Sequence, residues 1–234
     1  SGEEIEMKAL TVYTSIYFVG AGGIGMSALV RYCLAKGFMV AGYDRTRTAL
    51  TEALEREGAR LFYDESAGLI PSSFRDPETT LVVYTPAVPD THEGLAYFRE
   101  QGFCVVKRAE LLGLITRESR GLCVAGTHGK TTTSSMTAHI LAQSAVGCSA
   151  FLGGILKNYD SNLILSDRSD LVVIEADEYD RSFHHLRPYM AVITATDPDH
   201  LDIYGTHEAV KEAFSQFVRQ IRPDGNLIIK QGLA

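Results

Sequence analysis

A glycine turn near the middle of the chain holds the residues best suited to chemistry. Residues 122–125 are apolar, and the turn that follows reads Gly126-Thr127-His128-Gly129-Lys130-Thr131-Thr132. In a turn of this kind the backbone N–H groups and a helix N-terminus face an anion, the lysine reaches terminal phosphates and the threonine hydroxyl can hold Mg²⁺. Two residues separate Gly126 from Gly129, where the general phosphate loop has four. We interpret the segment as a compact relative of that loop.

Two later apolar segments end in side chains that suit a metal and nucleotide site. Residues 171–174 lead into Glu175-Ala176-Asp177-Glu178, and residues 190–194 lead towards Asp199-His200-Leu201-Asp202. Ligands of open α/β sheets bind beyond the carboxyl ends of the strands, so we expect Glu175 and His200 beside the Lys130 loop. Both would ligate Mg²⁺, and a site with a histidine also accepts Mn²⁺. Taken singly, the carboxylates also fit a solvated loop and the histidine a structural role.

The same geometry gives an expectation for Lys130. Its head group should face the phosphates from the start of the helix. Replacing it should therefore abolish productive nucleotide binding and leave the fold intact.

A second glycine turn lies near the N-terminus. Gly20-Ala21-Gly22-Gly23-Ile24-Gly25 fits the pattern G-x-G-x-x-G, follows a predicted strand, opens a predicted helix and precedes Asp44 by about 20 residues. The pattern predicts a diphosphate over the helix N-terminus, with Asp44 near a ribose or a base. It does not distinguish NAD, FAD and UDP-sugars, and glycines used only for tight packing remain an alternative.

The elements that position these turns alternate between strand and helix, which predicts a doubly wound parallel sheet. In the first half we expect strands at 15–20, 38–43, 81–84 and 103–106, with helices ending near 36 and spanning 48–57 and 91–101. A connecting helix over 108–117 places a domain boundary near residue 112. In the second half we expect strands at 122–125, 162–165, 171–174, 190–194 and 226–229, and helices at 130–143 and 207–221. The predicted fold is a Rossmann-like domain, 1–112, followed by part of a P-loop-type α/β domain, 113–234.

Composition narrows the class of protein. A net charge of −7 over 234 residues argues against a nucleic-acid-binding surface. No apolar run approaches the roughly 20 residues that a membrane-spanning helix needs. The four cysteines form no metal or redox motif, and we interpret them as reduced core residues. The acidic N-terminus lacks the apolar core of a signal peptide, so we expect a cytoplasmic protein that does not bind a membrane.

These motifs resemble the Mur ligase family, the ATP-dependent amino-acid ligases of peptidoglycan synthesis. Residues 126–132, 175–178 and 199–202 carry the resemblance, together with the run from Phe18 to Ser27. The resemblance implies that the first domain holds UDP-N-acetylmuramate on Ala21, Gly22, Gly23, Ile24, Gly25, Met26 and Ser27, with Asp44, Thr85 and Pro86 nearby. It implies that ATP lies on Gly126, Thr127, His128, Gly129, Lys130, Thr131 and Thr132. The implied catalytic residues are Lys130, Glu175 and His200, and the implied Mg²⁺ ligands are Thr131, Glu175 and His200.

The resemblance also implies a reaction. His128 and the Gly-Ile-Gly-Met-Ser run from Gly23 resemble the member that joins L-alanine to UDP-N-acetylmuramate through an acyl phosphate. A member that recycles murein tripeptide shares both features and is the alternative. An NAD-dependent oxidoreductase is a remote alternative, because it would give Lys130 and Glu175 no role. The family's amino-acid-binding third domain has no counterpart here, so we expect an inactive fragment. Ala195 stands where relatives often have Asn, which leaves the local hydrogen bonding open.

Overall fold

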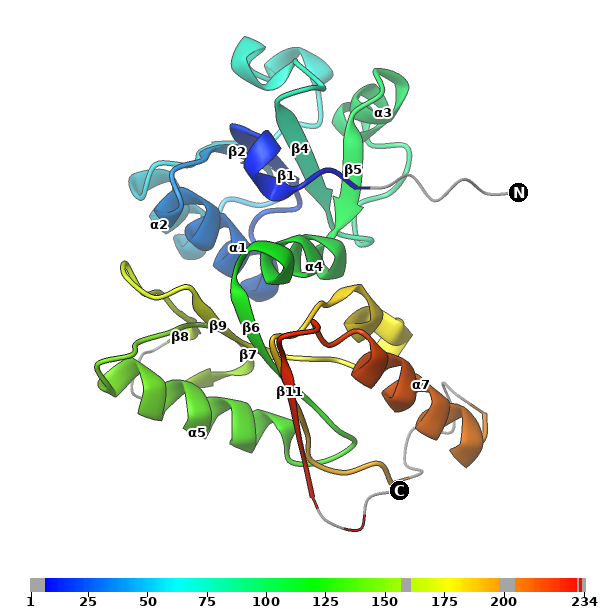
Figure 1. The fold of residues 1–234 in the computed structure, drawn as a ribbon. Coiled ribbons are helices and arrows are strands. Elements are labelled where there is room, and N and C mark those ends of the chain that lie inside the picture. The colour runs from blue at the N-terminus through cyan, green and yellow to red at the C-terminus, as the bar shows by residue number, and fades with distance from the viewer. Residues whose placement is uncertain (1–6, 157–160, 198–204, 231, 233–234) are drawn as a thin grey trace. The chain divides into compact units, whose positions relative to one another are not determined.

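The computed structural model describes residues 7–156, 161–197, 205–230 and 232 (Figure 1). The chain divides into two compact units, Ser1–Leu111 and Leu112–Ala234, which are described separately. Among the described residues, no helix combines the length and the apolar character needed to cross a membrane. The four cysteines are free thiols: Cys33, Cys123 and Cys148 are buried and Cys104 is partly buried.

The first unit is built on a parallel sheet of five strands in the order β3-β2-β1-β4-β5. The strands are β1 (Ser15–Val19), β2 (Met39–Tyr43), β3 (Arg60–Phe62), β4 (Thr80–Tyr84) and β5 (Cys104–Lys107). The helices are α1 (Ile24–Ala35), α2 (Ala49–Arg56) and α3 (Glu93–Glu100), and short 3₁₀ turns span Leu10–Val12 (η1), Ala67–Leu69 (η2) and Ser72–Phe74 (η3). Every residue of the central β1 is buried, as expected for a strand with both faces covered.

Aromatic packing fixes one face of this sheet. Tyr17 of β1 lies against Phe74 and Phe98, with ring centroids 6.0 and 5.0 Å away. Phe98 in turn contacts Phe103 at 4.9 Å. These rings join β1, η3, α3 and the residue before β5 into one buried core.

The second unit is built on a mixed sheet of six strands in the order β11-β10-β6-β9-β7-β8. The strands are β6 (Arg120–Ala125), β7 (Ser149–Leu156), β8 (Ser161–Ile164), β9 (Leu171–Glu175), β10 (Met190–Ile193) and β11 (Asn226–Ile229). The helices are α4 (Arg108–Glu118), which spans the division between the units, α5 (Lys130–Gln143) and α7 (His207–Arg219), with a 3₁₀ segment η4 (Tyr179–His185). All neighbouring strands are parallel except β7 and β8. The strand that carries the Lys130 loop, β6, therefore lies between β10 and β9.

The α/β fold class predicted from the sequence is confirmed, with two strands missed. β3 has only three residues, too few for a pattern. β7 contains Gly153 and Gly154, which weaken a strand pattern because glycine adds no side chain to the packing. Because β8 runs antiparallel to β7, the second sheet is mixed and not purely parallel.

Candidate functional site

The turn between β6 and α5 has the backbone geometry of an anion-binding loop. Gly126 has φ +144°, and a Cβ there would collide with the Thr194 side chain. Gly129 has φ +77° and is the N-cap of α5, with no side-chain hydrogen bond to the cap. The first amides of a helix have no partner within the helix, so those of α5 are available to an anion. Thr131 and Thr132, in this first turn, are exposed.

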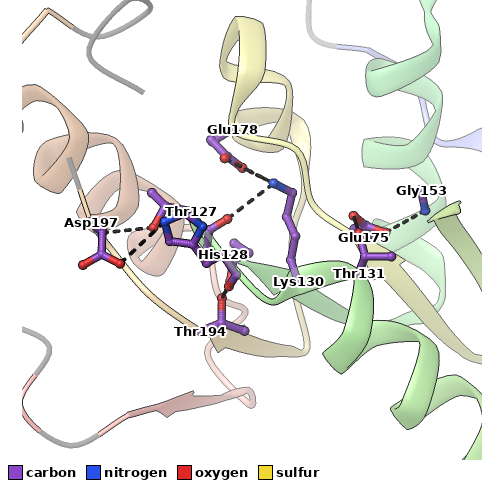
Figure 2. Close-up of polar contacts among 11 residues, drawn as sticks. Thr127, His128, Lys130, Thr131, Gly153, Glu175, Glu178, Thr194 and Asp197 are labelled. Carbon is purple, nitrogen blue, oxygen red and sulfur yellow. Dashed lines mark hydrogen bonds and ion pairs between the residues drawn. The ribbon is translucent and has the colours of Figure 1, made fainter. Parts of the chain in front are cut away.

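Hydrogen bonds tie the loop to the carboxyl end of β10 (Figure 2). The Thr127 N–H donates to the carbonyl of Ala195 at 2.9 Å, and the Asp197 N–H donates to Thr127 Oγ1 at 3.0 Å. The Thr194 hydroxyl donates to the carbonyl of His128. Ala195 thus holds the loop through its backbone carbonyl, which a residue of any type would supply. The hydrogen bond described here therefore does not require an asparagine at position 195.

Lys130 forms a buried ion pair. Its Nζ lies 3.2 Å from each carboxylate oxygen of Glu178 and donates to the carbonyl of Gly126 at 3.5 Å. Glu178 is 0% exposed and the Lys130 side chain 18%. Glu178 was not among the predicted site residues. Its place three residues after the end of β9, in the same acidic segment as Glu175, could have indicated it. The expectation that Lys130 can be removed without cost to the fold does not match this geometry, because its head group is the counter-ion of a buried carboxylate.

Glu175, at the end of β9, meets the first turn of α5. The Thr131 hydroxyl donates to Glu175 Oε1 at 2.6 Å, and the Gly153 N–H donates to Oε2 at 2.6 Å. A Cβ at position 153 would lie only 2.7 Å from Oε2, so the carboxylate occupies the space that glycine leaves. Sequence reasoning missed Gly153 because it missed β7. Figure 2 shows Thr131, Glu175 and Gly153 gathered beside the start of α5.

Two of the three predicted metal ligands, Thr131 and Glu175, lie within the described residues. Thr131 and Glu175 are in contact and present hard oxygen atoms, the donors that Mg²⁺ prefers. His200 lies outside the described residues, as do Asp199, Leu201 and Asp202. Within the part of the chain that the structure describes, no three His, Cys, Asp or Glu side chains cluster as a metal site. His128 Nε2 lies 3.8 Å from Asp197 Oδ2, and both side chains are more than half exposed.

The glycine turn of the first unit is braced by Asp44. The Gly22 N–H donates to Asp44 Oδ2 at 2.7 Å, and a Cβ at position 22 would lie 2.5 Å from the same oxygen. Gly20 has φ +97°, and a Cβ there would collide with Thr85. Asp44 therefore shapes the turn, and its predicted role beside a ribose or base stays a prediction.

The start of α1 has the character of an anion site. Its N-cap, Gly23, makes no side-chain hydrogen bond, and the first turn has no acidic residue. Arg108, which sequence reasoning did not single out, lies against this turn: a Cβ at Gly25 would be 2.9 Å from its Nε. A guanidinium beside the positive end of a helix dipole favours a negative ligand there.

A cavity of about 580 Å³ opens beside this turn. Its lining includes four of the predicted sugar-nucleotide residues, Gly23, Met26, Asp44 and Thr85. The other predicted residues differ in exposure: Ala21 and Ser27 are buried, whereas Ile24 and Pro86 are exposed. The buried Ser27 hydroxyl donates to the carbonyl of Ile24 at 2.9 Å, inside the first turn of α1.

Two sequence profiles of known protein families match this chain. The sequence profile described as "Mur ligase family, catalytic domain" matches residues 15–120, and the one described as "Mur ligase middle domain" matches residues 124–232. The chain belongs to the Mur ligase family. The resemblance that the motifs suggested is confirmed.

Individual Mur ligases extend the comparison. The chain is 67% identical over 220 residues to the UDP-N-acetylmuramate–L-alanine ligase of Parabacteroides distasonis and 66% identical over 219 residues to that of Phocaeicola vulgatus. Each alignment covers 94% of this chain and 48% of the relative, so the chain spans about half the length of the curated relatives it matches.

Solved Mur ligase structures share the fold. The UDP-N-acetylmuramate–alanine ligase of Thermotoga maritima matches with a TM-score of 0.74 and 30% identity, over 93% of this chain and 49% of that one. The UDP-N-acetylmuramate:L-alanyl-γ-D-glutamyl-meso-diaminopimelate ligase from Neisseria meningitides matches with a TM-score of 0.76 and 26% identity, over 94% and 72%. Fold likeness does not separate the two activities, whereas the relatives at 66–67% identity carry the alanine ligase name.

Proposed function

We propose that this chain is the sugar-nucleotide-binding and ATP-binding portion of a UDP-N-acetylmuramate–L-alanine ligase, an early step of peptidoglycan synthesis in the cytoplasm. The observation that carries the proposal is the pair of anion-binding turns, one in each unit, in a chain 67% identical to a ligase of that name. Residues 1–112 are assigned to the sugar nucleotide and 113–234 to ATP. The whole reaction belongs to a protein about twice this length, since the relatives are covered to 48%.

The proposed reaction activates a carboxylate. A carboxylate oxygen of UDP-N-acetylmuramate attacks the γ-phosphorus of ATP, ADP leaves, and an acyl phosphate forms. The amine of L-alanine then attacks the acyl carbon and loses a proton as inorganic phosphate leaves, which gives the amide. A positively charged group beside the transferring phosphoryl group stabilises the charge that spreads over its oxygens.

Lys130 is assigned this task in the second unit. An ammonium group has three N–H donors, so Lys130 can keep Glu178 and still donate to a phosphate oxygen. The amides at the start of α5 would hold the remaining phosphate oxygens. Mg²⁺, held by Thr131, Glu175 and His200, would neutralise charge between the phosphates. The observed contact between Thr131 and Glu175 supports this set because it places two hard oxygen donors beside the loop.

UDP-N-acetylmuramate is assigned to the first unit. Its diphosphate would lie over residues 21–27 at the start of α1, and Arg108 would supply the compensating charge. Thr85 lines the neighbouring cavity, which has room for the rest of a nucleotide. Asp44 would act mainly by holding Gly22 in place.

Calorimetric titration tests the ligands of this chain. UDP-N-acetylmuramate, MgATP and NADH are titrated separately, and the first two should each bind at one site. Each should also raise the melting temperature, because a ligand of the folded state stabilises it by linkage. Binding of NADH with no response to the UDP-sugar would refute the proposal in favour of an oxidoreductase.

The amino-acid substrate is tested in the full-length protein. ADP release is measured with ATP and UDP-N-acetylmuramate present, and with either L-alanine or murein tripeptide as the acceptor. Turnover with L-alanine and none with the tripeptide is the expected result. The opposite preference would assign the protein to tripeptide recycling.

A further inference from the structure

His92 is a buried histidine in the wall of the first unit's cavity. It is 3% exposed and lines the cavity together with Gly23, Tyr43 and Glu65. From the sequence alone His92 has no predicted role, because it falls within a predicted helix. In the structure it is the N-cap of α3, one residue before the helix begins.

A backbone hydrogen bond fixes the tautomer of His92. The Leu95 N–H donates to Nδ1 at 3.1 Å. A nitrogen that accepts a hydrogen bond carries no proton, so the proton of the neutral ring is on Nε2. Burial lowers the pKa of His92 more than the neighbouring Glu65 and Glu93 raise it, which keeps the ring neutral at pH 7. Nε2 is thus a fixed N–H donor.

This donor has no partner in the described chain. Nε2 is buried, and it makes no hydrogen bond. Buried N–H groups are nearly always paired, so an orphaned one on a cavity wall indicates a missing acceptor. The Tyr43 ring packs against the imidazole at 4.3 Å with its plane inclined by 64°, and Tyr43 lines the same cavity.

We propose that the His92 Nε2–H donates to the C4 carbonyl oxygen of a uracil base and so selects uridine nucleotides. The assignment rests on the proposed function, because a diphosphate on the α1 turn places its nucleoside in this cavity. Uracil has a carbonyl at C4, whereas cytosine has an amino group there, which would oppose the N–H donor. A site built to donate to a carbonyl rejects an analogue that lacks it, because the buried donor then stays unpaired.

His92→Asn is the matched variant for testing this assignment. Asparagine is a good N-cap, so its side chain can still accept from the Leu95 N–H, but it has no donor in the place of Nε2. Binding of UDP and CDP to wild type and variant is measured by calorimetry on the 234-residue chain. Loss of one neutral hydrogen bond should weaken UDP binding about three- to tenfold, with CDP binding unchanged.

The outcomes separate this assignment from the proposed function. Unchanged UDP binding in the variant, or equal weakening of UDP and CDP, would overturn the role of His92 and leave the proposed function standing. A wild-type chain that binds neither UDP nor UDP-N-acetylmuramate would overturn both. A second readout uses ¹⁵N-labelled histidine, since the Nε2 resonance missing from the variant should shift when UDP is added to wild type. No shift at saturating UDP would also overturn the assignment.

Discussion

The Lys130→Ala substitution should lower the free energy of unfolding as well as abolish ATP binding. Lys130 is the counter-ion of Glu178, which is fully buried. Removing one partner of a buried ion pair leaves an uncompensated charge in a medium of low dielectric constant. A substitution that looks like a simple loss of a phosphate contact therefore also destabilises the fold.

The magnitude follows from the burial of the pair. Breaking a buried ion pair costs about 3–5 kcal/mol. The Lys130 side chain is 18% exposed, so some solvent reaches it and the lower end applies, about 3 kcal/mol. For a chain of this size each kcal/mol corresponds to about 2–4 °C, so the melting temperature should fall by about 6–12 °C.

The double variant Lys130→Ala, Glu178→Gln separates stability from function. Glutamine has nearly the shape of glutamate and no charge, so the double variant should recover at least half of the lost stability. Thermal unfolding followed by circular dichroism measures this in a double-mutant cycle with Glu178→Gln alone. Neither Lys130 variant should bind MgATP. The reasoning fails if Lys130→Ala melts within about 2 °C of wild type, or if the double variant is no more stable than the single one.

Three further predictions concern other parts of the two units. Gly153→Ala should displace the Glu175 carboxylate, and MgATP binding should weaken at least tenfold by calorimetry while the UDP-sugar binds normally; unchanged MgATP affinity would contradict the placement of Glu175. Arg108→Ala should weaken UDP-N-acetylmuramate binding about tenfold with MgATP unaffected, as expected for one charge-assisted contact; Arg108→Lys should recover part of the loss, and full affinity in the alanine variant would exclude the contact. Because burial lowers the pKa of His92, the unfolded chain binds a proton there that the folded chain does not, so stability should fall as the pH drops below about 6.5. The melting temperature of His92→Asn should fall less between pH 7 and pH 5, and parallel curves would refute this.

Local patterns were sufficient to predict the two glycine turns and their places between a strand and a helix. The glycines at 126 and 129 have positive φ, and Gly20 has it in the first unit. Each turn lies between an apolar strand and a helix start, all within about ten residues, so the relevant contacts are close in sequence. The α/β class followed for the same reason, because strand and helix periodicities are local properties.

Contacts between distant segments could not be derived from the pattern. Glu178 meets Lys130 across 48 positions, and Gly153 meets Glu175 across 22, through a strand whose glycines hide its periodicity. Arg108 and His92 could not be singled out, because neither belongs to a sequence motif. Their significance depends on which side chains the tertiary fold brings against them.

The position of β6 within its sheet affects how the chain can fold during synthesis. β6 is the first strand of its unit in sequence, yet it pairs with β9 and β10. Arg120 can therefore pair only after Leu171 has been synthesised, and Leu122 only after Met190. The sheet of the first unit, by contrast, is complete once Lys107 is made. Contacts between distant residues form slowly because a long loop must close first. On a ribosome the first sheet can thus be complete before the Lys130 loop has the neighbouring strands that shape it, and sensitivity to proteases should persist longest in the second unit.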